Sequence, residues 1–267
     1  MRFFPQLGSG SLAQYPVVKR HKARTVVNES LDGSRLVFSD DQAREIEWDW
    51  ELRGLSAAEF EEINELFTAS EGSLESFFFI DPTGNALRFS EDLTQPPWSG
   101  DPGLIIASAV SDPFGTETAT RIINGGQISQ SIRQTIVAPG RYTYCFSGYF
   151  RAVEGGWTRF GWTHDGEAVW RLGEVGLVWK RFHCTGSLSG GPSPLVFQIE
   201  VPAGRAVEVS GLQVEGQREP SAYHKTNKMS GVYGKARFLD DVLTVTCEGA
   251  DDYTVRVRIG APIGLET

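Results

Sequence analysis

The stretch from Ser76 to Leu93 joins two segments of different character. Phe77-Phe-Phe-Ile80 carries a large apolar side chain at every position, which predicts a strand that is buried on both faces. Asp81-Pro-Thr-Gly84 follows at once and predicts a tight turn. We interpret this stretch as the place where one module is interrupted by another. If the chain returns to the first module near Tyr223, Asn85 and Tyr223 should lie close together.

The length supports two modules. A chain of 267 residues exceeds one typical domain. We expect residues 1–87 and 223–267 to form one discontinuous module with a single α-helix, of β-barrel-like form. We expect residues 88–222 to form an inserted antiparallel β-sandwich of the jelly-roll kind. The few strands after Tyr223 would be marginal alone, so they need the N-terminal sheet as a host.

Three signals describe the first module. Asp32-Gly33 lies between apolar segments and predicts a β-hairpin. Apolar and charged residues alternate strictly over residues 44–53, and Trp48 and Trp50 are among the apolar ones. This pattern predicts a half-buried strand. Ser56 precedes Glu59 by three positions in a capping-box pattern, so a helix is expected to begin there. Residues 1–24, with their prolines, read as an arm or edge segment.

The middle of the chain has no helical pattern. Short apolar segments recur between turn residues at the spacing typical of a sandwich. The nine predicted strands are 104–110, 119–123, 128–137, 142–151, 159–163, 169–172, 178–185, 195–201 and 207–214. The chain is therefore expected to be mainly β.

Bulk properties restrict the class of partner. The net charge of −9 and the pI near 5.0 argue against nucleic acid, which is held mainly by Lys and Arg. No apolar run approaches the ~18 residues that span a bilayer, and the N-terminus lacks the pattern of a signal peptide. Three cysteines without a CxxC pair fit a reducing cytoplasm and predict neither a zinc site nor a disulfide framework.

Aromatic residues of the sandwich are candidates for sugar binding, which needs exposed rings beside hydrogen-bonding groups. The candidates are Trp157, Trp162, Trp170 and Tyr149. The competing interpretation is that most of them fill the sandwich core, as large aromatic side chains usually do.

Catalysis and metal binding have weaker support. A glycosidase could use carboxylates in the polar loops. The candidates are Glu154, Asp165 and Glu167. Acidic residues in turns are, however, common at this composition. The four histidines show no ligand spacing. A structural calcium ion is a minor alternative, with oxygens from Asp101, Asp112 and Glu117. We expect no catalytic residues and no other cofactor.

Four elements follow one another in the N-terminal third: Gln14-Tyr15-Pro16, the strand with Trp48 and Trp50, Leu55-Ser56 with Glu59, and the strand end Phe77 to Pro82. In this order they resemble a family of tailed-bacteriophage distal tail (baseplate) proteins. The resemblance implies a structural virion protein of the tail tip that forms a ring, which we expect to be a hexamer, between the tail tube and the hub or fibre proteins. It would be assembled in the host bacterial cytoplasm. The candidate assembly residues are Tyr15, Pro16, Phe78 and Ile80.

The insert carries three short motifs: Leu87, Ser90, Glu91 and Trp98 at its start, Trp179-Lys-Arg181 within it, and Gly211, Gln213, Glu215 and Tyr223 at its end. With these motifs it resembles the carbohydrate-binding-like jelly rolls of phage tail and fibre proteins. The resemblance implies a peripheral domain that touches host-surface glycan, without membrane insertion. Three hypotheses stay open: a ring-forming tail subunit, a carbohydrate-binding adhesin with an anchoring N-terminal module, and a tail-associated glycan hydrolase.

Overall fold

The computed structural model describes residues 1–152 and 154–263. The described chain divides into two compact units. Unit 1 consists of Met1–Gly8, Ala13–Phe79 and the C-terminal segment from Tyr233, and unit 2 consists of Ser9–Leu12 and Ile80–Val232. The chain thus leaves unit 1 after Phe79 and returns to it at Tyr233, outside the expected limits of 88 and 222. Among the described residues there is no helix of the length and hydropathy that crossing a membrane requires.

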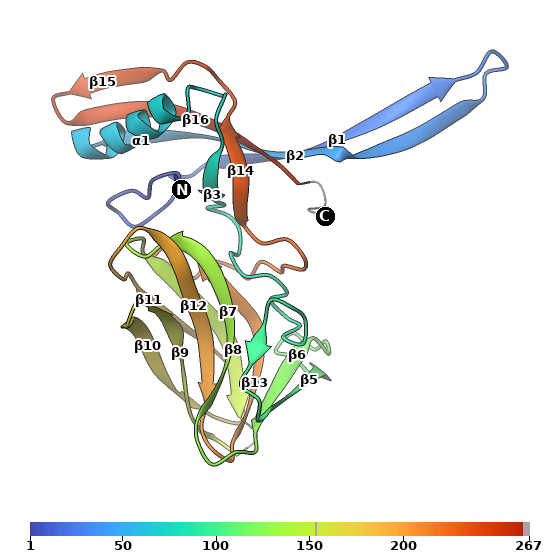
Figure 1. Cartoon of the computed structure of the whole chain (residues 1–267), viewed down its shortest axis with the longest axis vertical. Helices are drawn as coiled ribbons and strands as arrows, with labels where there is room; N and C mark the ends of the chain where they lie inside the picture. Colours follow the sequence, from blue (N-terminus) through green and yellow to red (C-terminus); the bar gives the residue numbers. More distant parts are fainter. Residues whose placement is uncertain (153, 264–267) are drawn as a thin grey trace. The chain divides into compact units, whose positions relative to one another are not determined.

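Unit 1 is built on one six-stranded sheet (Figure 1). In spatial order its strands are β1 (Val17–Glu29), β2 (Arg35–Leu55), β16 (Asp252–Pro262), β14 (Val232–Phe238) and β3 (Phe77–Ile80), and β15 (Val245–Gly249) pairs with β16. The expected β-rich module with one helix is confirmed. The described strands form an open sheet that ends at β1 and β3, so the barrel-like form is not observed.

Helix α1 (Ala57–Ala69) begins where the sequence predicts. The Ser56 hydroxyl accepts a hydrogen bond from the Glu59 N–H at 3.3 Å, and the Glu59 carboxylate accepts one from the Ser56 N–H at 2.9 Å. Ile63 and Leu66 of the helix are buried in one core with Trp48, as expected from the alternation of β2. The helix therefore covers the apolar face of the sheet.

Strands β1 and β2 form a long hairpin that extends away from the rest of its sheet (Figure 1). Its turn contains Gly33, whose N–H donates to the Ser30 carbonyl and whose φ is +83°, so the Asp32-Gly33 prediction is confirmed. The strands are longer than predicted, and residues 17–24 belong to β1, an edge strand of the sheet, as the edge alternative of the prediction has it.

Strand β3 has its edge covered by the start of the chain. The Phe78 N–H donates to the Arg2 carbonyl at 2.8 Å, and the Phe4 N–H donates to the Phe78 carbonyl at 3.0 Å. The Phe3 ring stacks on the Phe78 ring with centroids 5.0 Å apart. The predicted burial of this strand is therefore achieved within one chain.

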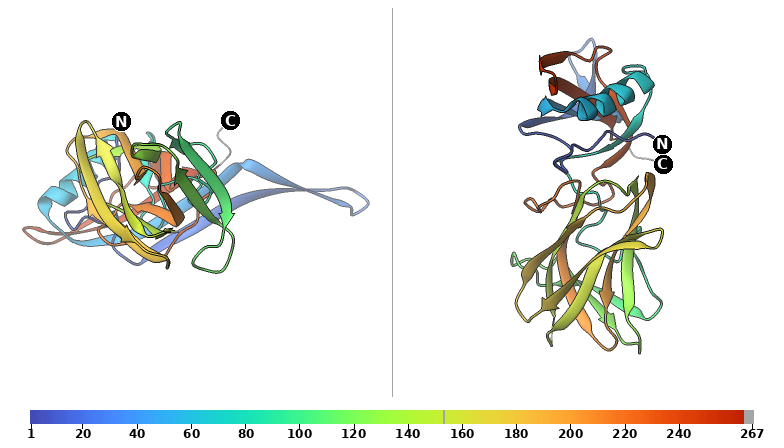
Figure 2. Two further views of the ribbon diagram at one scale, coloured as in Figure 1. Left: turned by 90° about the horizontal axis from the view of Figure 1, so that it is seen from below. Right: turned by 90° about the vertical axis from the view of Figure 1, so that its left-hand side faces the viewer.

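Unit 2 is a sandwich of two five-stranded sheets, which face each other in Figure 2. The first sheet, here the face sheet, has the order β10 (Glu167–Val175), β9 (Gly156–His164), β12 (Pro192–Val201), β7 (Gln130–Pro139) and β4 (Ser99–Gly100). The second has the order β11 (Lys180–Gly186), β8 (Tyr144–Ala152), β13 (Ala206–Glu215), β6 (Ala119–Asn124) and β5 (Leu104–Val110). All nine predicted strands are present, and the antiparallel sandwich is confirmed.

Asn85 joins the start and the end of unit 2. Its Nδ2 donates to the carbonyls of Leu212 and His224 at 2.9 and 3.1 Å, and its Oδ1 accepts from the Val214 N–H at 3.0 Å. His224 follows Tyr223 directly, so Asn85 and Tyr223 lie close together as expected.

Candidate functional site

The four candidate aromatic residues lie in three different environments. Trp162 is fully buried, and its ring stacks on Phe197 with centroids 5.4 Å apart. Since side chains alternate along β9, Phe160 and Trp162 point into the sandwich, whereas Trp157, Arg159 and Gly161 belong to its outer face. Trp162 therefore cannot contact a glycan, and its proposed role in binding is wrong.

Tyr149 lies on the outer face of the second sheet, on the opposite side of the sandwich. Its ring is half-buried by the Phe114 ring, with centroids 5.3 Å apart, and by the Arg181 guanidinium, 5.7 Å from the ring centroid. Because its face is already occupied, Tyr149 does not form a site with the tryptophans.

Trp157 and Trp170 share the outer face of the face sheet. In the register of β9 and β10, Trp170 is opposite Gly161, Leu172 is opposite Arg159, and Glu174 is opposite Trp157. Trp157 is 54% exposed and Leu172 is 60% exposed. The two strands thus place two indoles and one aliphatic side chain on a single accessible surface.

Arg159 holds the Trp170 ring in place. Its guanidinium lies 4.3 Å from the centroid of the Trp170 ring, within the range of a cation–π contact. Its Nη2 also donates to Glu200 Oε2 at 2.5 Å on the neighbouring strand β12. One face of the indole is therefore supported by a side chain that is itself anchored.

Polar side chains continue this face across β12 and β7. Gln198 is opposite Gly161 on one side and Arg133 on the other, and its Nε2 donates to Thr163 Oγ1 at 3.4 Å. Arg133 forms an ion pair with Asp101. We call the surface formed by Trp157, Arg159, Trp170, Leu172, Gln198 and Arg133 the Trp face. It combines aromatic rings with hydrogen-bonding groups, as sugar binding requires.

Gly161 permits the close approach of β9 and β10 at the centre of the Trp face. A Cβ at this position would lie only 1.9 Å from the Val169 carbonyl oxygen. Any larger residue here would displace β10, which carries Trp170.

An open cleft of about 670 Å³ lies at the edge of the sandwich, where β10 meets β11. Its lining residues are Thr143, Trp170, Arg171, Leu172, His183, Cys184, Thr185, Arg218 and Glu219. Trp170 and Leu172 belong to both the Trp face and this edge cleft, so the two surfaces are continuous. The sequence alone does not predict this cleft, because its lining residues come from separate strands and loops.

The acidic loop residues do not have the environment of catalytic acids. Glu167 accepts hydrogen bonds from the Ser189 N–H and hydroxyl, which lower the pKa of its carboxyl. Glu154 is 3.4 Å from Arg205, and Asp165 is 3.2 Å from His164 Nε2. A glycosidase acid needs a raised pKa, whereas the pKa of Glu167 is lowered.

Ser193, His164 and Asp165 lie close together. They are the residue types of a catalytic triad, but their geometry is not that of one. Ser193 Oγ lies 3.1 Å from His164 Nε2 and 3.3 Å from Nδ1. A hydroxyl at nearly equal distances from both ring nitrogens is not aligned with the lone pair of either. The arrangement therefore lacks the geometry that activates a serine.

The carboxylates suggested for calcium are used within the chain. Asp112 accepts hydrogen bonds from the N–H groups of Phe114 and Thr116 and from two threonine hydroxyls, which hold the pKa of its carboxyl well below its usual range even though burial opposes this shift. Asp101 accepts from the Ser131 N–H and pairs with Arg133. Among the described residues, no three His, Cys, Asp or Glu side chains form a group that could hold a metal ion.

The candidate assembly residues separate into two pairs. Tyr15 is 66% exposed, and Pro16 beside it is also exposed. Ile80 is buried and Phe78 is half-buried with the Phe3 ring stacked on it, so neither is freely exposed in the single chain, and their role at an interface stays a prediction. The sequence could not show that residues 2–4 would cover β3.

The distal part of the β1–β2 hairpin exposes the apolar residues that flank Asp32-Gly33, none of which was predicted to belong to a site. Val27 pairs with Val37, and Val26 pairs with Phe38, so apolar side chains occupy both faces. Val27, Val37 and Phe38 are 52%, 62% and 47% exposed. In the described part of the sheet no third strand flanks this segment. Apolar residues on both sides of Asp32-Gly33 were the signal that could have identified it.

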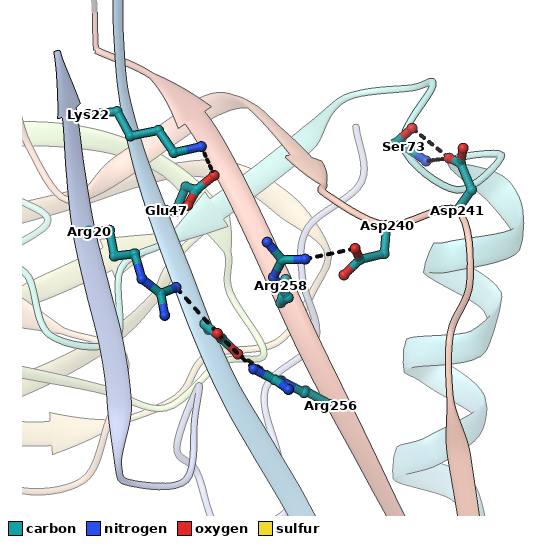
Figure 3. Close-up of polar contacts among 9 residues, drawn as sticks. Arg20, Lys22, Glu47, Ser73, Asp240, Asp241, Arg256 and Arg258 are labelled. Atoms are coloured by element: carbon teal, nitrogen blue, oxygen red, sulfur yellow. Dashed lines mark hydrogen bonds and ion pairs between the residues drawn. The ribbon is translucent and has the colours of Figure 1, made fainter.

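The other face of the unit 1 sheet carries a charged network (Figure 3). Asp49 accepts hydrogen bonds from Nε and Nη2 of Arg256, both at 3.0 Å, and from Arg20 at 3.3 Å. Lys22 pairs with Glu47. Both carboxylates are buried although they belong to the outer side of β2, because long basic side chains from β1 and β16 cover them.

No family model and no curated protein sequence matches the chain. About half of the chain is similar in fold to solved structures. The CBM22-1 xylan-binding domain of Paenibacillus barcinonensis Xyn10C is 15% identical over 49% of this chain and 91% of that chain, with a TM-score of 0.39. TmCBM61 in complex with beta-1,4-galactotriose is 19% identical over 51% and 99%, with a TM-score of 0.38.

The bacteriophage CBA120 tailspike protein 4 enzymatically active domain is 11% identical over 51% of this chain but only 22% of that chain, with a TM-score of 0.40. At these identities and TM-scores, the likenesses describe a fold and carry no argument about ligand or activity.

Proposed function

We propose that unit 2 is a non-catalytic glycan-binding domain and that the Trp face is its binding surface. The observation that carries this proposal is the placement of Trp157 and Trp170 on one accessible face, beside the polar groups of Arg159 and Gln198. Sugar rings have one apolar face and a rim of hydroxyl groups, so they need a flat aromatic surface bordered by donors and acceptors. The chain would then act as a carbohydrate-binding adhesin.

A glycan array probed with the labelled full chain tests this function. We expect binding to a limited set of oligosaccharides, and we expect this binding to be lost in the Trp157→Ala, Trp170→Ala double variant. The absence of binding to the array and to whole bacterial cells would refute the proposal.

A second proposal concerns unit 1, and it is supported by the exposed apolar residues of the hairpin. A two-stranded segment with apolar side chains on both faces is poorly stabilised in water, so a partner that covers it would be favourable. We propose that unit 1 is an assembly module, in keeping with a ring subunit of a phage tail tip in the virion. Further copies of the chain, the tail tube protein and hub or fibre proteins would be its partners.

Electron microscopy and native mass spectrometry of the purified chain test the assembly role. Closed rings, hexameric if the resemblance is a correct guide, are the expected result. A strict monomer at all concentrations that never joins a virion would contradict it and would leave the adhesin proposal standing.

A further inference from the structure

Two arginines in the edge cleft have no carboxylate partner among the residues that the structure describes. Arg171 donates from Nη1 to the His183 carbonyl at 2.8 Å, and this neutral acceptor leaves its charge uncompensated. The Arg218 side chain makes no hydrogen bond or ion pair with any described residue. Both side chains are exposed at the cleft.

Five other arginines of the sandwich form ion pairs with carboxylates. Arg121 and Arg151 share Glu208, and Arg159 pairs with Glu200. Arg133 and Arg205 have their own carboxylates, as described above. In a chain with a net charge of −9, this open cleft thus presents two guanidinium groups that no carboxylate of the described residues neutralises.

Contacts with neighbouring residues hold Arg218 in position at the cleft. Thr185 Oγ1 donates to the Arg218 carbonyl at 2.7 Å, which ties the loop after β13 to β11. The Arg218 side chain packs over Gly10, where an added Cβ would lie 3.0 Å from Arg218 Nε. The one carboxylate in the lining, Glu219, is 81% exposed and lies 3.7 Å from His183 Nε2.

We propose that the edge cleft binds an anionic substituent, a carboxylate or a phosphate, on a glycan whose sugar ring packs against Trp170. Guanidinium groups bind these anions through paired hydrogen bonds of matched geometry. Trp170 lines both surfaces, so a sugar on the Trp face can direct its charged group over the edge of β10. This inference names the ligand class of the proposed glycan-binding domain and rests on that function.

The test compares matched neutral and anionic probes on the full chain by calorimetry. The probes are galactan and galacturonan oligosaccharides, glucan and glucuronan oligosaccharides, and mannan and phosphomannan oligosaccharides. We expect at least one anionic probe to bind about tenfold more tightly than its neutral counterpart, since the guanidinium groups add charge-assisted hydrogen bonds to the anion. The uronates and the phosphomannan distinguish the carboxylate from the phosphate source.

The Arg218→Gln variant should remove this preference and leave binding of the neutral probes unchanged. Arg205→Gln is the matched control, because Arg205 is an exposed arginine of the same sandwich that does not line the cleft. Equal binding of neutral and anionic probes, or an unchanged preference in Arg218→Gln, would overturn the inference and leave glycan binding intact. Failure of every probe would count against both proposals.

Discussion

Trp170 is the residue on which the proposed binding surface depends most. The Arg159 guanidinium lies 4.3 Å from its ring centroid, and Arg159 is anchored by Glu200, so the indole is held before a ligand arrives. Preorganised aromatic groups lose little conformational entropy on binding, which makes them effective contacts.

Replacing Trp170 with alanine should weaken glycan binding by about tenfold or more, because truncation of a central aromatic contact commonly costs more than ~1.4 kcal/mol. Trp179→Ala is the matched control: Trp179 also lies beneath an arginine, Arg151 at 4.7 Å, but outside the Trp face. Calorimetry with a glycan identified on the array measures both variants. Equal losses in the two variants would show that the effect is not specific to the Trp face.

Asp49 makes the stability of unit 1 depend on pH. Hydrogen bonds from Arg256 hold the pKa of this carboxyl below its usual value, and Arg20 adds to the effect. A lowered pKa in the folded state stabilises the protein above the unfolded pKa of about 3.9, and this stabilisation is lost as the pH falls towards the folded value.

Asp49→Asn should therefore reduce the free energy of unfolding by roughly 2 kcal/mol at pH 7, the scale of a charge-assisted hydrogen bond. The difference between variant and parent should shrink as the pH falls below about 4. Chemical denaturation at a series of pH values measures this. A difference that is independent of pH would mean that Asp49 acts through packing alone.

The β1–β2 hairpin is the element that most needs a partner. Replacing Val37 and Phe38 together with serine removes apolar surface from both of its faces. We expect this change to weaken self-association at least about tenfold, because the two side chains together represent more than ~1.4 kcal/mol of burial. Sedimentation velocity measures the change.

Leu74→Ser is the control for the hairpin variant, since Leu74 is a comparably exposed apolar residue elsewhere in unit 1, at 60%. Self-association that is insensitive to the hairpin substitutions but lost in Leu74→Ser would place the interface near the end of α1 instead.

At the level of elements, local patterns were sufficient to predict much of the fold. The alternation of β2, the capping box at Ser56 and the turn at Asp32-Gly33 each fix a structure through neighbouring residues. Trp162 lies two residues after Phe160 in the same strand, so both side chains point to the same face. This spacing was the signal that Trp162 belongs to the core. The edge cleft and the covering of β3 by Phe3 could not be predicted, because they depend on contacts between distant parts of the chain.

At the scale of the whole molecule, the two units predict two separable unfolding events. The sandwich is inserted in the chain between Phe79 and Tyr233 of unit 1. These two residues lie on the neighbouring strands β3 and β14. Deleting residues 80–232 and joining the ends with a short glycine linker should therefore leave a folded unit 1. Calorimetry should show that this variant keeps one of the two transitions of the full chain. A disordered product would contradict the independence of unit 1.

The central claim is that glycan binds the Trp face, and the indole N–H signals of the seven tryptophans test it directly. The measurement is a two-dimensional NMR titration of the full chain with a glycan identified on the array, with assignments from single Trp→Phe variants. We predict that the signals of Trp157 and Trp170 shift with ligand, while those of Trp48 and Trp162 in the two cores do not. Binding that leaves the Trp157 and Trp170 signals unchanged would contradict the account.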